Sequence, residues 1–183
     1  MNDFKHRRAE PGEFPRLGAA LDTVNRDFAA AFPDQEPLVL MVWGGDEDID
    51  EQVYVALSDG TSHGNGISEP DTDAADRIAL DRIALDLVAE AAQETVIERL
   101  WQVWPVCPFH KIGTHPRPEG TTADWEYGES RGMRVVWWCR GHHGGDCHDL
   151  ASVGELAGAL PGRQRREIRR RERKRGRRPP SGG

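Results

Sequence analysis

Metal-binding side chains are gathered into one quarter of this chain, between Trp104 and His148. All three cysteines and five of the seven histidines of the 183-residue sequence lie there. Zinc prefers four thiolate and imidazole ligands, and a short Cys-x2-His turn presents two of them at once. This spacing occurs twice, with 28 residues between His110 and Cys139. The sequence therefore predicts a structural zinc site made of Cys107, His110, Cys139 and His142.

Later residues of the same segment offer alternative ligands. A site with Cys147 in place of His142 would exchange an imidazole for a softer thiolate. Cys107 and Cys139 belong to every version of the site. The contrasting interpretation is that the cysteines bind no metal and are simply buried as small apolar side chains. The residues that can each replace one of the four predicted ligands are His115, His143, Cys147 and His148.

The residues between the two Cys-x2-His turns indicate how the turns are supported. Arg-Val-Val-Trp-Trp at 134–138 is a β-rich run that leads directly into Cys139. Two metal-binding turns at the ends of paired strands are typical of a zinc ribbon. The sequence thus predicts a zinc-ribbon-like segment over residues 104–160.

Four short motifs within residues 104–156 resemble one group of proteins. They are Trp-Pro-x-Cys-Pro-x-His from 104, His-Pro at 115–116, Trp-x-Cys ending at 139 and Val-Gly-Glu-Leu at 153–156. The segment is similar to small uncharacterised proteins of high-GC Gram-positive bacteria, which themselves resemble zinc ribbons. This resemblance implies metal binding and indicates neither an activity nor a substrate.

Apolar periodicity predicts the elements that precede the metal-binding segment. Spacings of four, three and four predict a helix over 14–32, and short apolar runs predict strands at 36–45 and 52–57. A second helix is predicted over 71–100, with Asp71 or Asp73 as its N-cap, and Trp101 and Trp104 continuing one face. A short helix is expected over 150–160. The predicted buried stripe of the second helix is Leu80, Ile83, Leu87, Ala91 and Ile97.

These elements predict an α+β fold: a small antiparallel sheet with two helices, followed by a zinc-ribbon-like segment and a disordered basic tail. The corresponding division is a flexible lead-in at 1–13, a helix-strand-strand-helix region at 14–103, the Cys/His segment at 104–160 and the tail at 161–183.

The tail carries a charge opposite to that of the rest of the protein. Residues 163–178 contain eleven Arg/Lys and two Glu, a charge of +9, whereas the remainder carries −16. Such an arm can bind nucleic-acid phosphates without reading bases, because no aromatic residue interrupts it. The predicted nucleic-acid contacts are Arg165, Arg166, Arg169, Arg170, Arg171, Arg173, Lys174 and Arg175.

The rest of the composition restricts the cellular setting and the chemistry. The sequence contains no run of 18 apolar residues, so it predicts no membrane-spanning helix. The basic N-terminus is not followed by the apolar segment of a secretory signal. An odd number of cysteines, three, does not suit a disulfide framework. We therefore expect a cytoplasmic protein with reduced thiols. The favoured function is a non-enzymatic zinc-binding interaction module with an unknown protein partner. Nucleic-acid association through the tail is the alternative, and a zinc hydrolase using Asp146 or a nearby histidine as base is the minor one.

Overall fold

A computed structural model of the protein describes residues 6–44, 51–70, 77–122, 134–142 and 146–162, together with residues 166 and 170. The predicted α+β class is confirmed: two small antiparallel sheets are combined with helices. The candidate N-caps of the second helix, Asp71 and Asp73, lie outside the described residues.

The first helix forms where apolar periodicity predicts it. Helix α1 spans Pro15–Ala31, with proline in its first turn, where a missing N–H costs no hydrogen bond. Its buried stripe contains Leu17, Leu21, Val24 and Phe28. Asp27 is also buried on this helix, next to the apolar stripe.

The first sheet contains the two predicted strands and one that was not predicted. Strands β2 (Val39–Trp43) and β3 (Gln52–Ala56) pair antiparallel, and β1 (His6–Arg8) adds to the free edge of β2. The expectation of a flexible lead-in is therefore wrong for residues 6–8. All three residues of β1 are exposed and polar. The strand therefore has no apolar pattern from which it could be predicted.

Helix α2 spans Arg77–Leu100, but its buried face differs from the predicted stripe. Leu80 and Ala91 are buried as expected, whereas Ile83 is 42% exposed and Leu87 and Ile97 are only partly buried. Alanine and other small residues form much of the buried surface of this helix, because other elements pack against it from two sides. Its buried residues are Leu80, Ala84, Val88, Ala89, Ala91, Ala92, Gln93, Thr95 and Val96.

The two tryptophans after α2 do not continue one face of the helix. Trp101 has a left-handed backbone with φ of 54° and is 86% exposed, whereas Trp104 is 2% exposed. The left-handed residue ends the helix, so helical spacing no longer applies beyond Leu100.

The second sheet contains the Cys/His segment. Strands β4 (His115–Pro118), β5 (Val135–Cys139) and β6 (His148–Ser152) form an antiparallel sheet with β5 in the centre. The helix expected over 150–160 is wrong at its start, since its first residues belong to β6; the short helix α3 covers only Leu156–Ala159. All five residues of β5 are buried.

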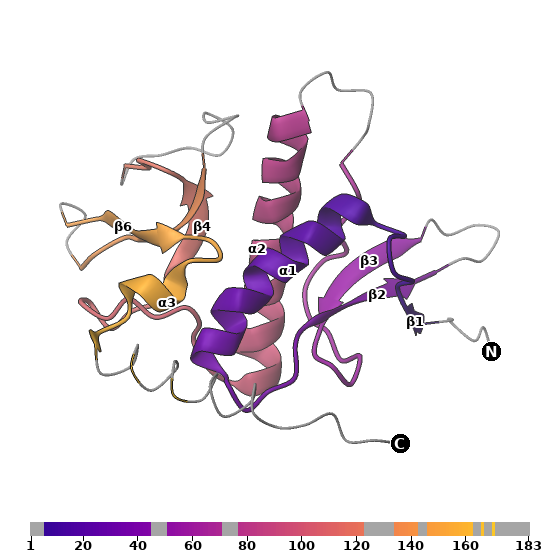
Figure 1. The fold of residues 1–183 in the computed structure, drawn as a ribbon, viewed down its shortest axis with the longest axis horizontal. Helices are drawn as coiled ribbons and strands as arrows, with labels where there is room; N and C mark the ends of the chain where they lie inside the picture. The colour runs from indigo at the N-terminus through magenta and orange to yellow at the C-terminus, as the bar shows by residue number, and fades with distance from the viewer. Residues whose placement is uncertain are drawn as a thin grey trace.

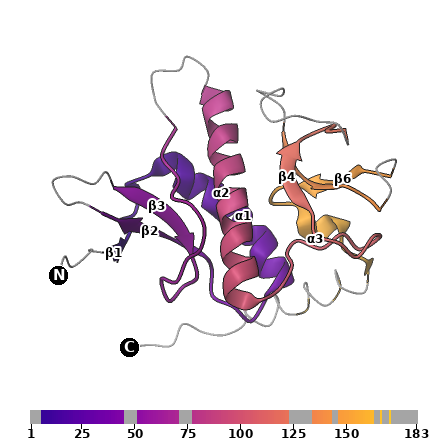
Figure 2. The ribbon, with the colours of Figure 1, turned by 180° about the vertical axis from the view of Figure 1, so that it is seen from behind.

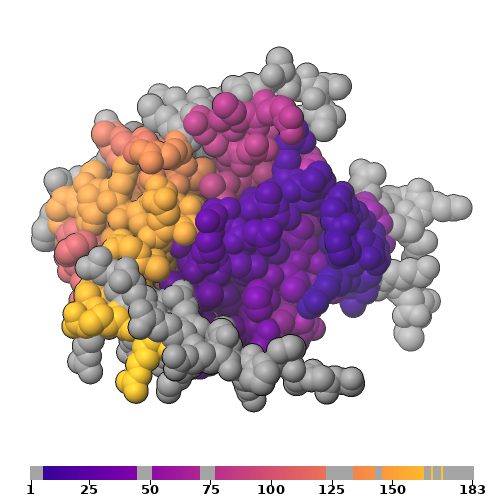
Figure 3. Space-filling view, viewed as in Figure 1, coloured from indigo at the N-terminus to yellow at the C-terminus, as the bar shows by residue number. Residues whose placement is uncertain are grey.

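The helix pair lies between the two sheets (Figures 1 and 2). Helix α2 contacts β3 on one side and both β4 and β5 on the other, while α1 contacts β2 and α3. Figure 3 shows the orange surface of the C-terminal sheet abutting the indigo surface of α1. One apolar core therefore continues through the boundary predicted near residue 103, with Trp104 against Phe28 and Trp137.

A buried carboxylate joins α1 to the second sheet. Asp27 Oδ2 accepts hydrogen bonds from Trp137 Nε1 at 2.6 Å and from the Gly154 main-chain N–H at 2.6 Å, and Oδ1 accepts from the Leu156 N–H at 2.8 Å. Burial raises the pKa of Asp27 above its ordinary value, although these three donors favour the charged form. The sequence analysis did not identify this connection.

Candidate metal centre

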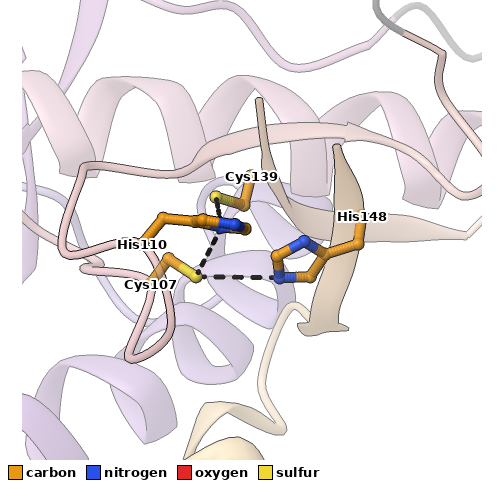
Figure 4. A group of neighbouring side chains, drawn as sticks. All are labelled: Cys107, His110, Cys139 and His148. Carbon is orange, nitrogen blue, oxygen red and sulfur yellow. Dashed lines mark hydrogen bonds between the residues drawn. The ribbon is translucent and has the colours of Figure 1, made fainter. Parts of the chain in front are cut away.

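Three segments bring four metal-binding side chains together at one end of the second sheet. Cys107 and His110 lie in the turn before β4, Cys139 is the last residue of β5, and His148 is the first residue of β6. Figure 4 shows the four side chains converging on a common point. The antiparallel register places Cys139 directly opposite His148. Strand pairing alone therefore brings these two side chains to the same end of the sheet.

The first two ligands are presented by a tight, hydrogen-bonded turn. The Lys111 N–H donates to the Cys107 carbonyl at 2.9 Å, and the Cys107 N–H donates to the Ile112 carbonyl at 2.9 Å. Lys111 closes the turn with a left-handed φ of 61°. The chain thus reverses direction within a few residues, which directs both side chains toward the end of β5.

The distances between ligand atoms match a four-coordinate metal. All four atoms lie within 4.8 Å of one another. Cys107 Sγ is 3.7 Å from His110 Nδ1 and 3.6 Å from His148 Nε2, and Cys139 Sγ is 3.3 Å from His110 Nδ1. Metal–sulfur and metal–nitrogen bonds of about 2.3 and 2.0–2.1 Å give a sulfur–nitrogen separation of about 3.6 Å in a tetrahedron. The three sulfur–nitrogen separations lie close to this value, so the cluster could hold one metal ion.

Asp146 holds both imidazoles by the ring nitrogen that faces away from the cluster. Its Oδ2 lies 3.1 Å from His110 Nε2, and its main-chain carbonyl lies 3.1 Å from His148 Nδ1. A proton on each of these outer nitrogens leaves the inner nitrogen with a free lone pair, which is the form that binds a metal. One residue thereby favours the metal-binding tautomer of both histidines.

Gly141 makes room for Asp146. Its φ is 68°, and a Cβ built at this position would lie 2.9 Å from the main-chain carbonyl carbon of Asp146 and closer still to its side chain. Only glycine combines this left-handed conformation with so close an approach. The Gly-containing turn after β5 is therefore part of what positions the histidines.

Burial opposes ionisation of the Cys139 thiol when no cation is present. Both cysteines are fully buried. Burial, and then the neighbouring Cys107 thiol, raise the pKa of Cys139, against the hydrogen bond from the Gly141 main chain. A bound cation reverses this preference, because the thiolate is the ligand and its charge is neutralised at the metal.

The structure brings together three of the four favoured ligands and one of the alternatives. Cys107, His110 and Cys139 are in the cluster, and His148 occupies the place for which the spacing favoured His142. The exposed ring of His142 instead packs edge-on against His110, with 5.2 Å between ring centroids. A strand prediction for 148–152 would have paired His148 with Cys139.

The remaining alternative ligands lie outside the cluster. His115 is on β4, where burial and then the positive charges of Arg117 and Arg140 lower its pKa. Cys147 is partly exposed and is not one of the four clustered residues, and His143 lies outside the described residues. Of the predicted nucleic-acid contacts, the described residues include Arg166 and Arg170, both exposed; the other six (Arg165, Arg169, Arg171, Arg173, Lys174 and Arg175) lie outside them.

Comparison with known proteins finds no matching family model, no similar curated protein and no similar solved structure. The resemblance to zinc-ribbon-like proteins stays a prediction. Within the part of the chain that the structure describes, no helix has both the length and the apolar character needed to cross a membrane.

Proposed function

We propose that this protein is a non-enzymatic zinc-binding protein, in which one structural zinc ion fixes the second sheet as part of a protein-interaction module. The observation that carries the proposal is the group formed by Cys107, His110, Cys139 and His148, whose ligand atoms lie within 4.8 Å of one another. Three of their sulfur–nitrogen separations, at 3.3, 3.6 and 3.7 Å, are close to the edge of a coordination tetrahedron.

The donor set favours zinc over other metals. Two thiolates and two imidazoles in a tetrahedral arrangement are a common structural zinc site, whereas magnesium and calcium prefer oxygen ligands. Asp146 contributes its oxygens to the histidines and is not one of the clustered ligands. This arrangement resembles the carboxylate–histidine support found around zinc in other proteins.

A structural role fits the coordination better than a catalytic one. Catalytic zinc sites keep one position for water or substrate and take three protein ligands. Here four protein side chains supply the complete set, and the two thiols are fully buried. Asp146, the base of the hydrolase alternative, lies beside His110 Nε2, on the side of the ring away from the sulfur atoms. These features support a closed site.

Elemental analysis of the purified full-length protein tests the proposal. We expect one zinc per chain, lost from Cys107→Ser and from Cys139→Ser. Cys147→Ser is the matched control: it removes a thiol one residue from His148 without removing a clustered ligand, so it should keep one zinc. A metal-free wild-type protein that stays folded would contradict the proposal. Cobalt substitution provides a second test, since absorption typical of three protein ligands and one water would favour the catalytic alternative.

A further inference from the structure

A cavity lies between the first halves of α1 and α2, outside the candidate metal site. Residues of α1 from Pro15 to Thr23 and residues of α2 from Arg77 to Leu85 line a volume of about 530 Å³. Figure 3 shows the two helices side by side, with α1 in indigo and α2 in magenta. Small-molecule sites commonly have volumes of about 300–1,000 Å³, so this cavity is large enough for a small ligand.

The lining of this cavity is positively charged, although the protein around it is acidic. Among the ten described residues that line it, three are arginine (Arg16, Arg77 and Arg82) and one, Asp81, is acidic. Three arginines and one aspartate give a local charge of +2, whereas the sequence outside 163–178 carries −16. Charges further away than about 8 Å are largely screened at physiological salt. A small anion in the cavity would therefore respond mainly to the arginines.

The three guanidinium groups retain donors for such an anion. Arg77 and Arg82 have no ion pair among the described residues. Arg16 Nε lies 3.4 Å from Asp81 Oδ1, but this buried N–H has no hydrogen-bond partner in the described part of the chain. A buried donor without an acceptor is costly, and an anionic oxygen is the strongest acceptor that a guanidinium can gain.

The main-chain donors at the start of α1 are already used. Glu69 accepts hydrogen bonds from the Arg16 N–H at 2.8 Å and the Leu17 N–H at 3.2 Å, and the Gly18 N–H donates to the Phe14 carbonyl at 2.8 Å. Glu69 is not one of the described residues that line the cavity. Recognition of an anion there would therefore depend on the arginine side chains and not on the helix terminus.

The two arginines of α2 come from a short duplication in the sequence. Asp-Arg-Ile-Ala-Leu occurs at 76–80 and again at 81–85. Five residues advance a helix by about 500°, so the two copies start about 140° apart around its axis. Arg77 and Arg82 nevertheless both line the cavity, since their long side chains can reach it from different sides of α2. The duplication thus provides two guanidiniums where one copy provides one.

The charge and geometry of the lining suit a phosphate monoester. The planar guanidinium donates two parallel hydrogen bonds to phosphate or carboxylate oxygens. A phosphate monoester has three terminal oxygens and a charge of about −1.5 to −2 at pH 7, which matches three arginines and a local charge of +2 better than a single carboxylate does. A nucleic acid is less suited, because its many phosphates would also approach the acidic body. Apolar residues beside the arginines are Ala19, Ala20, Ile78 and Leu85.

We propose that this cavity binds a small phosphorylated molecule. Arg16, Arg77 and Arg82 hold its phosphate group, and its apolar part contacts Ile78 and Leu85. The inference goes beyond the proposed function and does not depend on it, because none of the four clustered metal ligands is among the described residues that line the cavity.

Titration of the full-length protein with phenyl phosphate in a phosphate-free buffer, followed by nuclear magnetic resonance, tests the proposal. We expect a dissociation constant of about 1 mM or below. Arg82→Gln should weaken binding at least about tenfold, because it removes charge-assisted hydrogen bonds. Arg82→Lys should weaken it less, since it keeps the charge and loses the planar fork.

Arg8→Gln is the matched control. Arg8 is an exposed arginine on β1 that has no ion pair among the described residues and does not line the cavity. Its replacement removes the same charge from the protein, so the dissociation constant should stay within about twofold of wild type. Circular dichroism and zinc content of each variant show whether the fold and the metal site are retained.

The other outcomes of this experiment are distinguishable. No binding at about 10 mM phenyl phosphate, or equal weakening by Arg82→Gln and Arg8→Gln, would overturn the proposal. Tighter binding of phenylacetate would overturn it in favour of a carboxylate, and tighter, Arg82-dependent binding of single-stranded RNA would overturn it in favour of nucleic acid. Phenyl phosphate binding that depends on Arg82 in a zinc-free protein would support the cavity and contradict only the structural zinc.

Discussion

The sheet of β1, β2 and β3 and the sheet of β4, β5 and β6 flank the same helix pair, yet they are stabilised by different side chains. In the first sheet, Leu40, Val42, Val53 and Val55 are buried on strands that pair along five residues. In the second, β4 has only four residues and two of them are proline. Proline cannot donate a ladder hydrogen bond, so β4 has only two main-chain donors, those of His115 and Arg117.

The second sheet compensates with contacts concentrated at a few atoms. Four Cys and His side chains that could hold a metal ion cluster at one end of it, and three hydrogen bonds to Asp27 hold it to α1. A sheet stabilised by many buried apolar contacts loses little free energy of unfolding when one surface side chain is changed. A site of four ligands loses much of its metal affinity when one ligand is removed. The comparison teaches that the second sheet should be the more fragile half.

Removing the proposed zinc ion should give the largest difference between the two sheets. Structural zinc contributes about 10–16 kcal/mol of binding free energy in isolated zinc-finger peptides. This is more than the free energy that opposes local opening of a small sheet without the metal. With chelator, we expect amide exchange in β5 to accelerate at least about 100-fold while exchange in β2 and β3 changes less than about tenfold. Hydrogen exchange with mass spectrometry measures both. Equal acceleration in the two sheets would mean that they unfold as one unit.

Replacing Asp27 should produce the next largest effect. Asp27→Ala leaves the Trp137 indole and two main-chain N–H groups buried without their acceptor, at a cost of about 3 kcal/mol or more in the free energy of unfolding. Urea denaturation followed by circular dichroism measures this cost. The control is Asp22→Ala, an exposed position on the same helix, expected within about 0.5 kcal/mol of wild type. Similar values for both variants would show that this connection contributes little.

A smaller, pH-dependent effect is expected at Asp86, on the side of α2 that faces β4. Burial, and then the charge of Glu90, raise the pKa of Asp86 to about 6. Between about pH 4 and pH 6 the folded protein therefore holds a proton that the unfolded chain has released, so stability falls as the pH rises through this window. Asp86→Asn removes this loss and should stabilise the protein at pH 7 by about 1–2 kcal/mol, allowing for partial solvent screening.

Thermal and urea unfolding of Asp86→Asn and wild type from pH 4 to pH 8 measure the difference. It should grow up to about pH 6 and then stay constant. Glu98→Gln on an exposed part of the same helix is the control. A difference that does not change with pH would contradict the raised pKa.

The parts of the fold that were predictable are those in which one segment determines its own structure. Helix α1 follows from the spacing of Leu17, Leu21, Val24 and Phe28, and β2 from an apolar run that ends at glycine. Strand β1 carries no such signal, because His6–Arg8 are exposed and polar and show no apolar alternation. The face of α2 was mispredicted because it is covered from two sides, which selects alanines over larger side chains.

The four clustered residues of the candidate metal site also differ in whether local or long-range features determine them. Cys107 and His110 are three residues apart in one turn, so their spacing is sufficient to predict them. His148 depends on the pairing of β5 with β6, which places it opposite Cys139 across the sheet. Local spacing pointed to His142 instead, since it repeats the Cys-x2-His pattern. The Asp27 connection spans 110 residues or more and has no local signal at all.

His142 and His148 therefore provide the smallest and sharpest comparison. His142 has the local spacing but lies outside the cluster with an exposed ring, whereas His148 lacks that spacing and supplies a ligand atom. We expect His142→Ala to keep one zinc per chain with affinity changed less than about threefold, since it removes an edge contact to His110 and none of the four clustered ligand atoms. His148→Ala should weaken binding on the order of 100-fold or more, beyond the loss typical of residues that merely support a ligand. Competition with a chromophoric chelator measures both affinities. The opposite ranking would place the fourth ligand where local spacing put it, and would mean that strand pairing does not select the ligands of this site.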